Sequence, residues 1–120
     1  MSTMAEKVED EEFIQAFRSG QLDKIRDWLE KKKINLKKKY KVLEEWYRPL
    51  TPLGLAVYFG KKEMVQYLIE SCGQDVNQRV NGDCTALYVA VDFSHTNLEV
   101  VRFLLEHKAD PNMESSDFVS

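Results

Sequence analysis

Residues 51–56 read Thr-Pro-Leu-Gly-Leu-Ala, and residues 85–90 repeat the pattern as Thr-Ala-Leu-Tyr-Val-Ala. A more divergent block, Phe-Ile-Gln-Ala, occupies residues 13–16. The alanines that end the three blocks are 40 and 34 residues apart, which is close to one constant spacing. Self-similarity at a period of about 20–50 residues is typical of repeat architectures, in which each copy is one structural unit. The sequence therefore predicts about three stacked units.

A second apolar pattern follows each block at a matching distance. The three patterns are Ile25, Trp28 and Leu29; Val65, Leu68 and Ile69; and Val101, Leu104 and Leu105. Residues three and four apart lie on one face of a helix, so each pattern predicts a second, longer helix. We expect inner helices over 13–19, 52–59 and 86–93, and outer helices near 22–32, 62–71 and 98–107.

Local signals support these helix boundaries. Thr51 can cap the inner helix of the second unit, with Pro52 at its first helical position, and Thr85 can cap the same helix in the third unit. Gly20 and Gly60 each follow the alanine of their unit by four residues, where a tight turn needs a glycine. Each unit is thus expected to be a helix, a turn and a helix.

Stacking of the units is expected to bury the alanines. Neither helix of a unit can cover its apolar face alone, so neighbouring units must pack on each other. Ala16, Ala56 and Ala90 then lie where a larger side chain would hold the helices apart. The segment 73–84 contains the glycines and polar residues of a hairpin-like connection.

These blocks resemble the ankyrin repeat family. Residues 51–56 resemble its T-P-L-H-x-A signature, with Gly54 in place of the histidine, and residues 85–90 are a weaker copy with Tyr88 at that position. The resemblance extends to the second helix of the repeat and to the segment that leaves it, at 99–106, 74–77 and 109–112. It implies an all-α ankyrin-repeat solenoid of about three helix-turn-helix units with hairpin connections.

The expected organisation is a single ankyrin-repeat domain over residues 1–120. Its repeats are expected at about 10–36, 48–77 and 81–112, with an insertion at 37–47 and a partial fourth hairpin at 113–120. The insertion is either an enlarged hairpin or a helical segment. The acidic residues 9–12 are expected to begin the first helix, where they suit its positive dipole end.

Composition narrows the class of protein. Apolar residues make up 43% of the chain, charged residues 31%, and the net charge is -3. This is a globular composition, with no apolar run long enough to span a membrane and no secretory signal at the N-terminus. We expect a cytoplasmic protein, with the nucleus as the alternative.

Catalytic and metal-binding patterns are weak in this sequence. Cys72, Cys84, His95 and His107 are about ten or more residues apart, and this spacing matches none of the usual zinc patterns. Neither histidine is placed beside a nucleophile, and the phosphate-binding loops G-x-x-x-x-G-K-[ST] and G-x-G-x-x-G are missing from the sequence. We therefore expect no enzyme activity, no cofactor and no metal site.

The ankyrin resemblance implies a protein partner, bound by a concave groove and by the hairpin tips. In ankyrin repeats, the second and third residues after each of these alanines line these surfaces, together with several residues of the hairpins. Here the candidate binding residues are Tyr47, Arg48, Leu50, Tyr58, Phe59, Arg79, Asn81, Asp92 and Phe93. The aromatic and arginine side chains are of the types that dominate binding hot spots. For Phe59 and Phe93, a place in the core is an equal alternative.

Two alternatives to this function stay open at the level of sequence. A dense basic run consists of Lys31, Lys32, Lys33, Lys37, Lys38, Lys39 and Lys41. It can bind nucleic acid or an anionic phospholipid or direct nuclear import, or it can be a solvated helix end whose lysines complement the helix dipole. The other alternative is an N-terminal regulatory ankyrin segment of a larger protein. Fold alone does not decide among an inhibitor, a scaffold and a targeting module.

Overall fold

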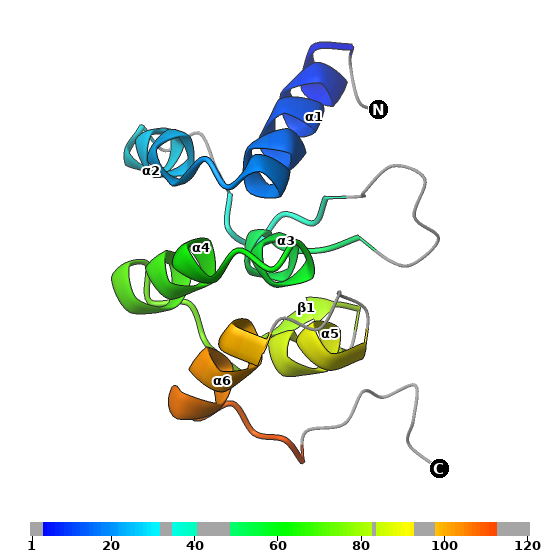
Figure 1. The fold of residues 1–120 in the computed structure, drawn as a ribbon. Coiled ribbons are helices and arrows are strands. Elements are labelled where there is room, and N and C mark those ends of the chain that lie inside the picture. The colour runs from blue at the N-terminus through cyan, green and yellow to red at the C-terminus, as the bar shows by residue number, and fades with distance from the viewer. Residues whose placement is uncertain (1–3, 32–34, 41–48, 83, 93–97, 113–120) are drawn as a thin grey trace.

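Three helix pairs follow one another along the chain (Figure 1). The computed structural model describes residues 4–31, 35–40, 49–82, 84–92 and 98–112, with the side chains of residues 4–10 and 92 left out. The pairs are α1 (Met4–Ser19) with α2 (Leu22–Glu30); α3 (Pro52–Tyr58) with α4 (Lys62–Gln66) and its π-helical continuation η1 (Tyr67–Ser71); and α5 (Ala86–Asp92) with α6 (Leu98–Glu106). We call these pairs, with their connecting segments, units one, two and three.

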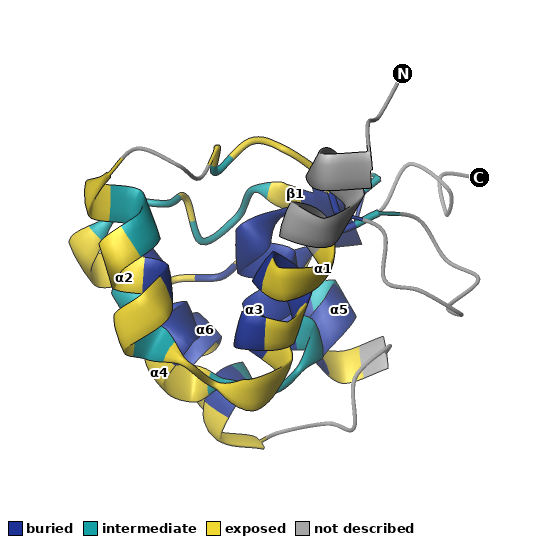
Figure 2. Cartoon of the chain, turned by 90° about the horizontal axis from the view of Figure 1, so that it is seen from above, coloured by how far each residue is buried: buried dark blue, intermediate teal, exposed yellow. Residues whose placement is uncertain are grey.

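The helices form two layers. Helices α1, α3 and α5 pack on one another as the inner layer, and each also packs on the outer helix of its own unit (Figures 1 and 2). Ala16, Ala56 and Ala90 are at most 1% exposed, so the predicted close approach of the inner helices is confirmed. Within the described residues, no helix is both long and apolar enough to cross a bilayer.

The predicted helix caps are present. The Thr51 hydroxyl accepts a hydrogen bond from the Gly54 N–H, and the Thr85 hydroxyl accepts one from the Tyr88 N–H, both at 3.3 Å. Gly20 and Gly60 have φ angles of +72° and +68°, the left-handed conformation that the turn between helices requires. The two turns are closed by equivalent bonds of 2.9 Å from Gln21 N to Ala16 O and from Lys61 N to Ala56 O.

Position 54 needs a glycine because Leu50 and Val80 of the neighbouring hairpin segments pack directly against its backbone. A Cβ atom at this position would lie 3.0 Å from Leu50 Cδ2, 3.0 Å from Val80 Cβ and 3.1 Å from the Val80 carbonyl oxygen. That oxygen also accepts the Thr51 N–H at 3.0 Å, which fixes its place. The histidine of the family signature does not fit against this packing.

The connections between units form a backbone ladder. Strands β1 (Arg79–Asn81) and β2 (Cys84–Thr85) pair antiparallel, so the expected hairpin within 73–84 is confirmed. Leu50 forms bridges to both Tyr40 and Asn81, including hydrogen bonds of 2.7 and 2.8 Å with Tyr40. Of the two alternatives for the insertion at 37–47, its described part therefore fits an enlarged hairpin. Residues 41–48 lie outside the described part of the chain.

The structure corrects two expectations about helices. Helix α1 begins at Met4, so the acidic residues 9–12 lie within the helix rather than at its start. The outer helix of unit two widens into the π-helical turn η1. In both outer helices a buried leucine is followed by a residue with a positive φ, which ends the helix: Leu68 and Gly73 in unit two, Leu104 and Lys108 in unit three. The interval between these two residues is one residue longer in unit two. The wider turn absorbs the extra residue.

Candidate functional site

A patch of aromatic and cationic side chains joins the inner helices of units one and two. The Arg18 guanidinium lies over the Phe59 ring, 5.3 Å from its centroid, and the Tyr58 ring packs edge-on against Phe59 at 5.1 Å. Arg18 is exposed, whereas Tyr58 and Phe59 are half-buried. Phe59 packs against the hydrophobic core and also contacts Arg18. We call Arg18, Tyr58 and Phe59 the inner patch.

Two of the sequence-predicted binding residues are corrected by their burial. Leu50 is 1% exposed and Asn81 is 3% exposed. Leu50 belongs to the hydrophobic core, and the Asn81 side chain donates a hydrogen bond of 3.3 Å to the Pro49 carbonyl. Neither side chain is presented to a partner, because the ladder between the hairpins draws both positions inward.

The other predicted binding residues divide into accessible and undescribed positions. Arg79 is exposed at the start of β1, on the hairpin. Tyr47, Arg48 and Phe93 lie outside the described residues, as does the side chain of Asp92, whose backbone ends α5. Of the predicted binding residues, the accessible described ones are therefore Tyr58, Phe59 and Arg79.

Side chains also link units two and three at their outer edge. His107 at the end of α6 places Nε2 2.9 Å from the Glu70 carboxylate of η1. Close by in sequence, the Asn77 side chain accepts the Asp110 N–H at 2.8 Å and donates to the Lys108 carbonyl at 3.4 Å. The patterns weighed for His107 in the sequence, a zinc site and a nucleophile–base pair, do not predict this contact with Glu70. A signal was present, because Glu70 precedes His107 by 37 residues, which is about one repeat.

Comparison with known proteins decides the family. A sequence model of the family described as "Ankyrin repeats (3 copies)" matches residues 13–115. The chain belongs to the ankyrin repeat family. Ankyrin repeats are generally protein-binding modules and are typically non-catalytic.

Two curated relatives share part of the ankyrin stack. The chain is 44% identical over 64 residues to "Zinc finger CCCH domain-containing protein 66" of Arabidopsis thaliana, a match that covers 52% of this chain and 10% of the relative. It is 40% identical over 48 residues to "Putative ankyrin repeat protein FPV222" of Fowlpox virus (strain NVSL), which covers 40% of this chain and 6% of that protein. The chain thus spans a tenth or less of the length of these relatives.

The lysine run lies at the end of the first ankyrin unit. Lys31 is exposed and pairs with Asp27 at 3.2 Å, one turn earlier on the helix. Lys37 and Lys39 are exposed, and the ammonium of Lys38 lies 4.9 Å from the centroid of the Tyr40 ring. Lys32, Lys33 and Lys41 lie outside the described residues. The described lysines are therefore exposed to solvent, as both a binding surface for anions and a solvated helix end require.

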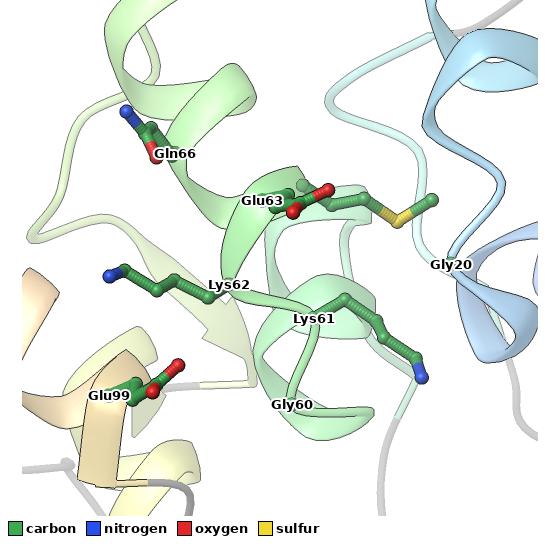
Figure 3. Close-up of a pocket in the computed structure, with 8 residues that line it drawn as sticks. Gly20, Gly60, Lys61, Lys62, Glu63, Gln66 and Glu99 are labelled. Carbon is green, nitrogen blue, oxygen red and sulfur yellow. The ribbon is translucent and has the colours of Figure 1, made fainter.

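The hollows on the described surface of the ankyrin stack are open and are lined by both polar and apolar atoms. One of about 470 Å³ lies beside the start of α4, where Lys61 passes Gly20 and where Lys62 and Glu99 both form part of the wall (Figure 3). Its lining combines amines and carboxylates with one thioether, Met64. In the part of the chain that the structure describes, no three histidine, cysteine or acidic side chains converge as metal ligands.

Partial burial makes the Cys72 thiol a poor nucleophile. Cys72 is half-buried beside Tyr67, and burial raises the pKa of its thiol, although a hydrogen bond with Tyr67 acts in the opposite direction. Arg26 of α2 covers the Tyr67 ring at 5.3 Å from its centroid. The contact between Arg26 and Tyr67 joins the outer helices of units one and two, whereas the contact between Tyr67 and Cys72 lies within unit two.

Proposed function

We propose that this ankyrin stack binds a partner protein through its inner-helix side, with the inner patch and Arg79 as contacts. The observation that carries the proposal is the inner patch itself. Arg18 and Phe59 come from neighbouring units and meet at 5.3 Å, with Tyr58 packed against the same ring. Half-buried aromatic rings beside an arginine are the composition of a binding hot spot.

The chemistry of the inner patch indicates the kind of segment that it fits. A guanidinium that lies over a ring keeps its N–H donors at the edge of its plane, where they can pair with a carboxylate. The exposed parts of the Tyr58 and Phe59 rings offer an apolar surface next to these donors. The patch therefore suits a partner segment in which an acidic residue neighbours an apolar one.

Alanine substitution of Tyr58 tests the proposal by separating binding from folding. Tyr58 is only half-buried, so Tyr58→Ala should leave the fold intact, with a loss of roughly 0.5 kcal/mol or less in the free energy of unfolding. A hot-spot residue contributes about 2 kcal/mol, so partner affinity should fall roughly thirtyfold. Affinity capture from cells that express the chain, followed by titration calorimetry on the captured partner, measures this loss.

Matched controls lie on the opposite side of the stack. Gln66 and Arg102 are exposed on outer helices, and their substitution by alanine should leave partner affinity unchanged. Arg102→Ala should leave stability unchanged as well, which makes it the control for both measurements. If Tyr58→Ala unfolds the chain, Tyr58 is a core residue. If Gln66→Ala abolishes binding while Tyr58→Ala preserves it, the partner uses the outer helices and the proposal is wrong.

The lysines support a second candidate function, binding to nucleic acid or to an anionic lipid surface. The observation in its favour is that Lys37, Lys38 and Lys39 are all exposed, directly before Tyr40 in the chain. Phosphate contacts release counterions, so such binding weakens steeply with salt. Replacing Lys37, Lys38 and Lys39 with glutamine should then abolish retention on heparin or on phosphatidylserine vesicles at low salt. Equal retention of both proteins excludes this candidate.

A further inference from the structure

Both ring nitrogens of His107 face hydrogen-bond acceptors. Nε2 lies 2.9 Å from Glu70 Oε2, and Nδ1 lies 2.9 Å from the Phe103 carbonyl oxygen. A neutral imidazole carries one N–H and can donate only one of these bonds, whereas the imidazolium ion donates both. The geometry around His107 therefore matches its charged form.

The rest of the surroundings hold the imidazole in this position. The Phe103 ring stacks on it with centroids 3.9 Å apart and an interplanar angle of 25°. Glu70 is fixed in turn by Gln66, whose side-chain amide donates to Glu70 Oε1 at 2.9 Å. Each oxygen of the carboxylate thus has its own partner, one within its unit and one across the interface.

The extra residue of unit two lies in the turn that carries Glu70. Glu70 belongs to η1, the π-helical turn that unit two has and unit three lacks. A π-helical turn changes the direction of the side chains that follow it, and single turns of this kind are frequent at functional sites. Here the π-helical turn presents Glu70 to unit three. The extra residue of unit two is thereby linked to the contact between Glu70 and His107.

We propose that Glu70 and His107 form a pH-dependent clamp between the second and third units of the stack. The protonated imidazole closes the clamp by donating to Glu70 and to the Phe103 carbonyl at once. Loss of the proton removes one of the two donors and the charge, and the hold on α6 weakens. The clamp does not depend on the partner or on the inner patch.

Charges around His107 support the clamp. The hydrogen bond with Glu70 raises the pKa of His107 above its ordinary value of 6.5, with further contributions from the Phe103 carbonyl and from the charges of Glu70 and Glu106. Glu70 faces His107 from η1, and Glu106 from α6 itself. Hydrogen bonds from Gln66 and His107 lower the pKa of the Glu70 carboxyl below 4.5.

The direction of the pH dependence follows from these two pKa shifts. A group whose pKa is raised by folding stabilises fully below its unfolded value, and this contribution disappears as the pH rises through the folded value. For His107 the loss therefore occurs above pH 6.5. The lowered pKa of Glu70 gives the opposite limb, with loss below pH 4.5. The clamp is strongest between these two limits.

Titration of His107 by NMR is the direct test. The chain has two histidines, and the spectrum of His107→Gln assigns the His107 signal. In the wild type, His107 should titrate above pH 6.5, and in Glu70→Gln the midpoint should return toward that value. Glu106→Gln is the matched control, because it removes a neighbouring charge and leaves the 2.9 Å bond with Glu70 in place. It should move the midpoint by less.

Hydrogen exchange tests whether the titration acts on the interface between units. After correction for the intrinsic pH dependence of exchange, protection of the α6 amides should fall in the wild type as the pH rises through the His107 midpoint. In Glu70→Gln this protection should be nearly level with pH. A wild-type midpoint at or below 6.5, equal effects of Glu70→Gln and Glu106→Gln, or α6 protection with the same pH profile in both proteins would each overturn the proposal.

Discussion

Replacing Gly54 by alanine should destabilise the protein, although the general rule for helices predicts the opposite. Gly54 lies within α3, and Gly→Ala in a helix interior normally stabilises by about 1 kcal/mol. The new Cβ would contact Leu50 Cδ2, Val80 Cβ and the Val80 oxygen at 3.0–3.1 Å. None of these can retreat easily, since Leu50 and Val80 are fully buried and the oxygen is held by Thr51.

Overpacking of a core costs about 1–3 kcal/mol, which exceeds the helical gain. We expect a net loss of about 1 kcal/mol, or a fall of roughly 4 °C in the melting temperature. Urea and thermal unfolding followed by circular dichroism measure both quantities. A rise in the melting temperature of Gly54→Ala would refute the argument from close approach.

Gly73 supplies the control, because a Cβ there meets no atom within 4 Å and the position has a φ of +69°. Its alanine variant should be destabilised through backbone strain, and asparagine, which tolerates this conformation, should recover part of the loss. At Gly54 a larger side chain should instead increase the loss, so Gly54→Ser should be less stable than Gly54→Ala.

Two further predictions concern contacts between units and the reactivity of a thiol. Asn77→Ala removes the bonds to Asp110 and Lys108, which should cost about 1 kcal/mol in urea unfolding; unchanged stability would show that these bonds contribute nothing net. Because burial raises the pKa of Cys72, its alkylation by iodoacetamide at pH 8 should be slower in the folded protein than in urea and should accelerate with pH. Equal rates in the two states would contradict this, with a Cys84→Ala variant isolating the Cys72 signal.

The repeating features of the fold could be predicted because each rests on a local physical demand. Ala16, Ala56 and Ala90 recur where helices touch, and all are buried. Thr51 and Thr85 cap helices that begin with the next residue, and a hydroxyl in that position has few other uses. An apolar spacing of three and four residues, repeated in each of the three units, was enough to predict the helix pairs.

The remainder of the structure depends on pairing between distant residues. Leu50 and Asn81 occupy hairpin positions that the ankyrin resemblance assigns to a binding surface, yet the ladder with Tyr40 turns both inward. The pairing spans the insertion after unit one, so no local pattern marks it. The π-helical turn is equally hidden, because Val65, Leu68 and Ile69 keep helical spacing before the extra residue takes effect.

The start of α1 was missed for a different reason. The chain before Phe13 has no apolar period, and hydrophobic spacing was the criterion for a helix. Residues 4–12 nevertheless contain four glutamates together with one methionine, one alanine and one lysine, all good helix formers, so intrinsic propensity extends the helix to Met4. Within the candidate site, the contact of Arg18 with Phe59 could not be predicted, because it depends on the packing of two units.

The backbone ladder gives the stack one stiff edge. Tyr40, Leu50 and Asn81 connect successive hairpins through main-chain bridges, which resist stretching because hydrogen bonds are directional. The opposite edge, between the outer helices, is held by side-chain packing and by the His107 bond. An elastic body of this kind bends about its stiff edge, so slow flexing should spread the outer helices while the distance between hairpins stays constant. A ligand that binds the hairpins would therefore contact sites at a constant spacing. A ligand that binds the outer helices would contact sites whose spacing changes as the stack bends.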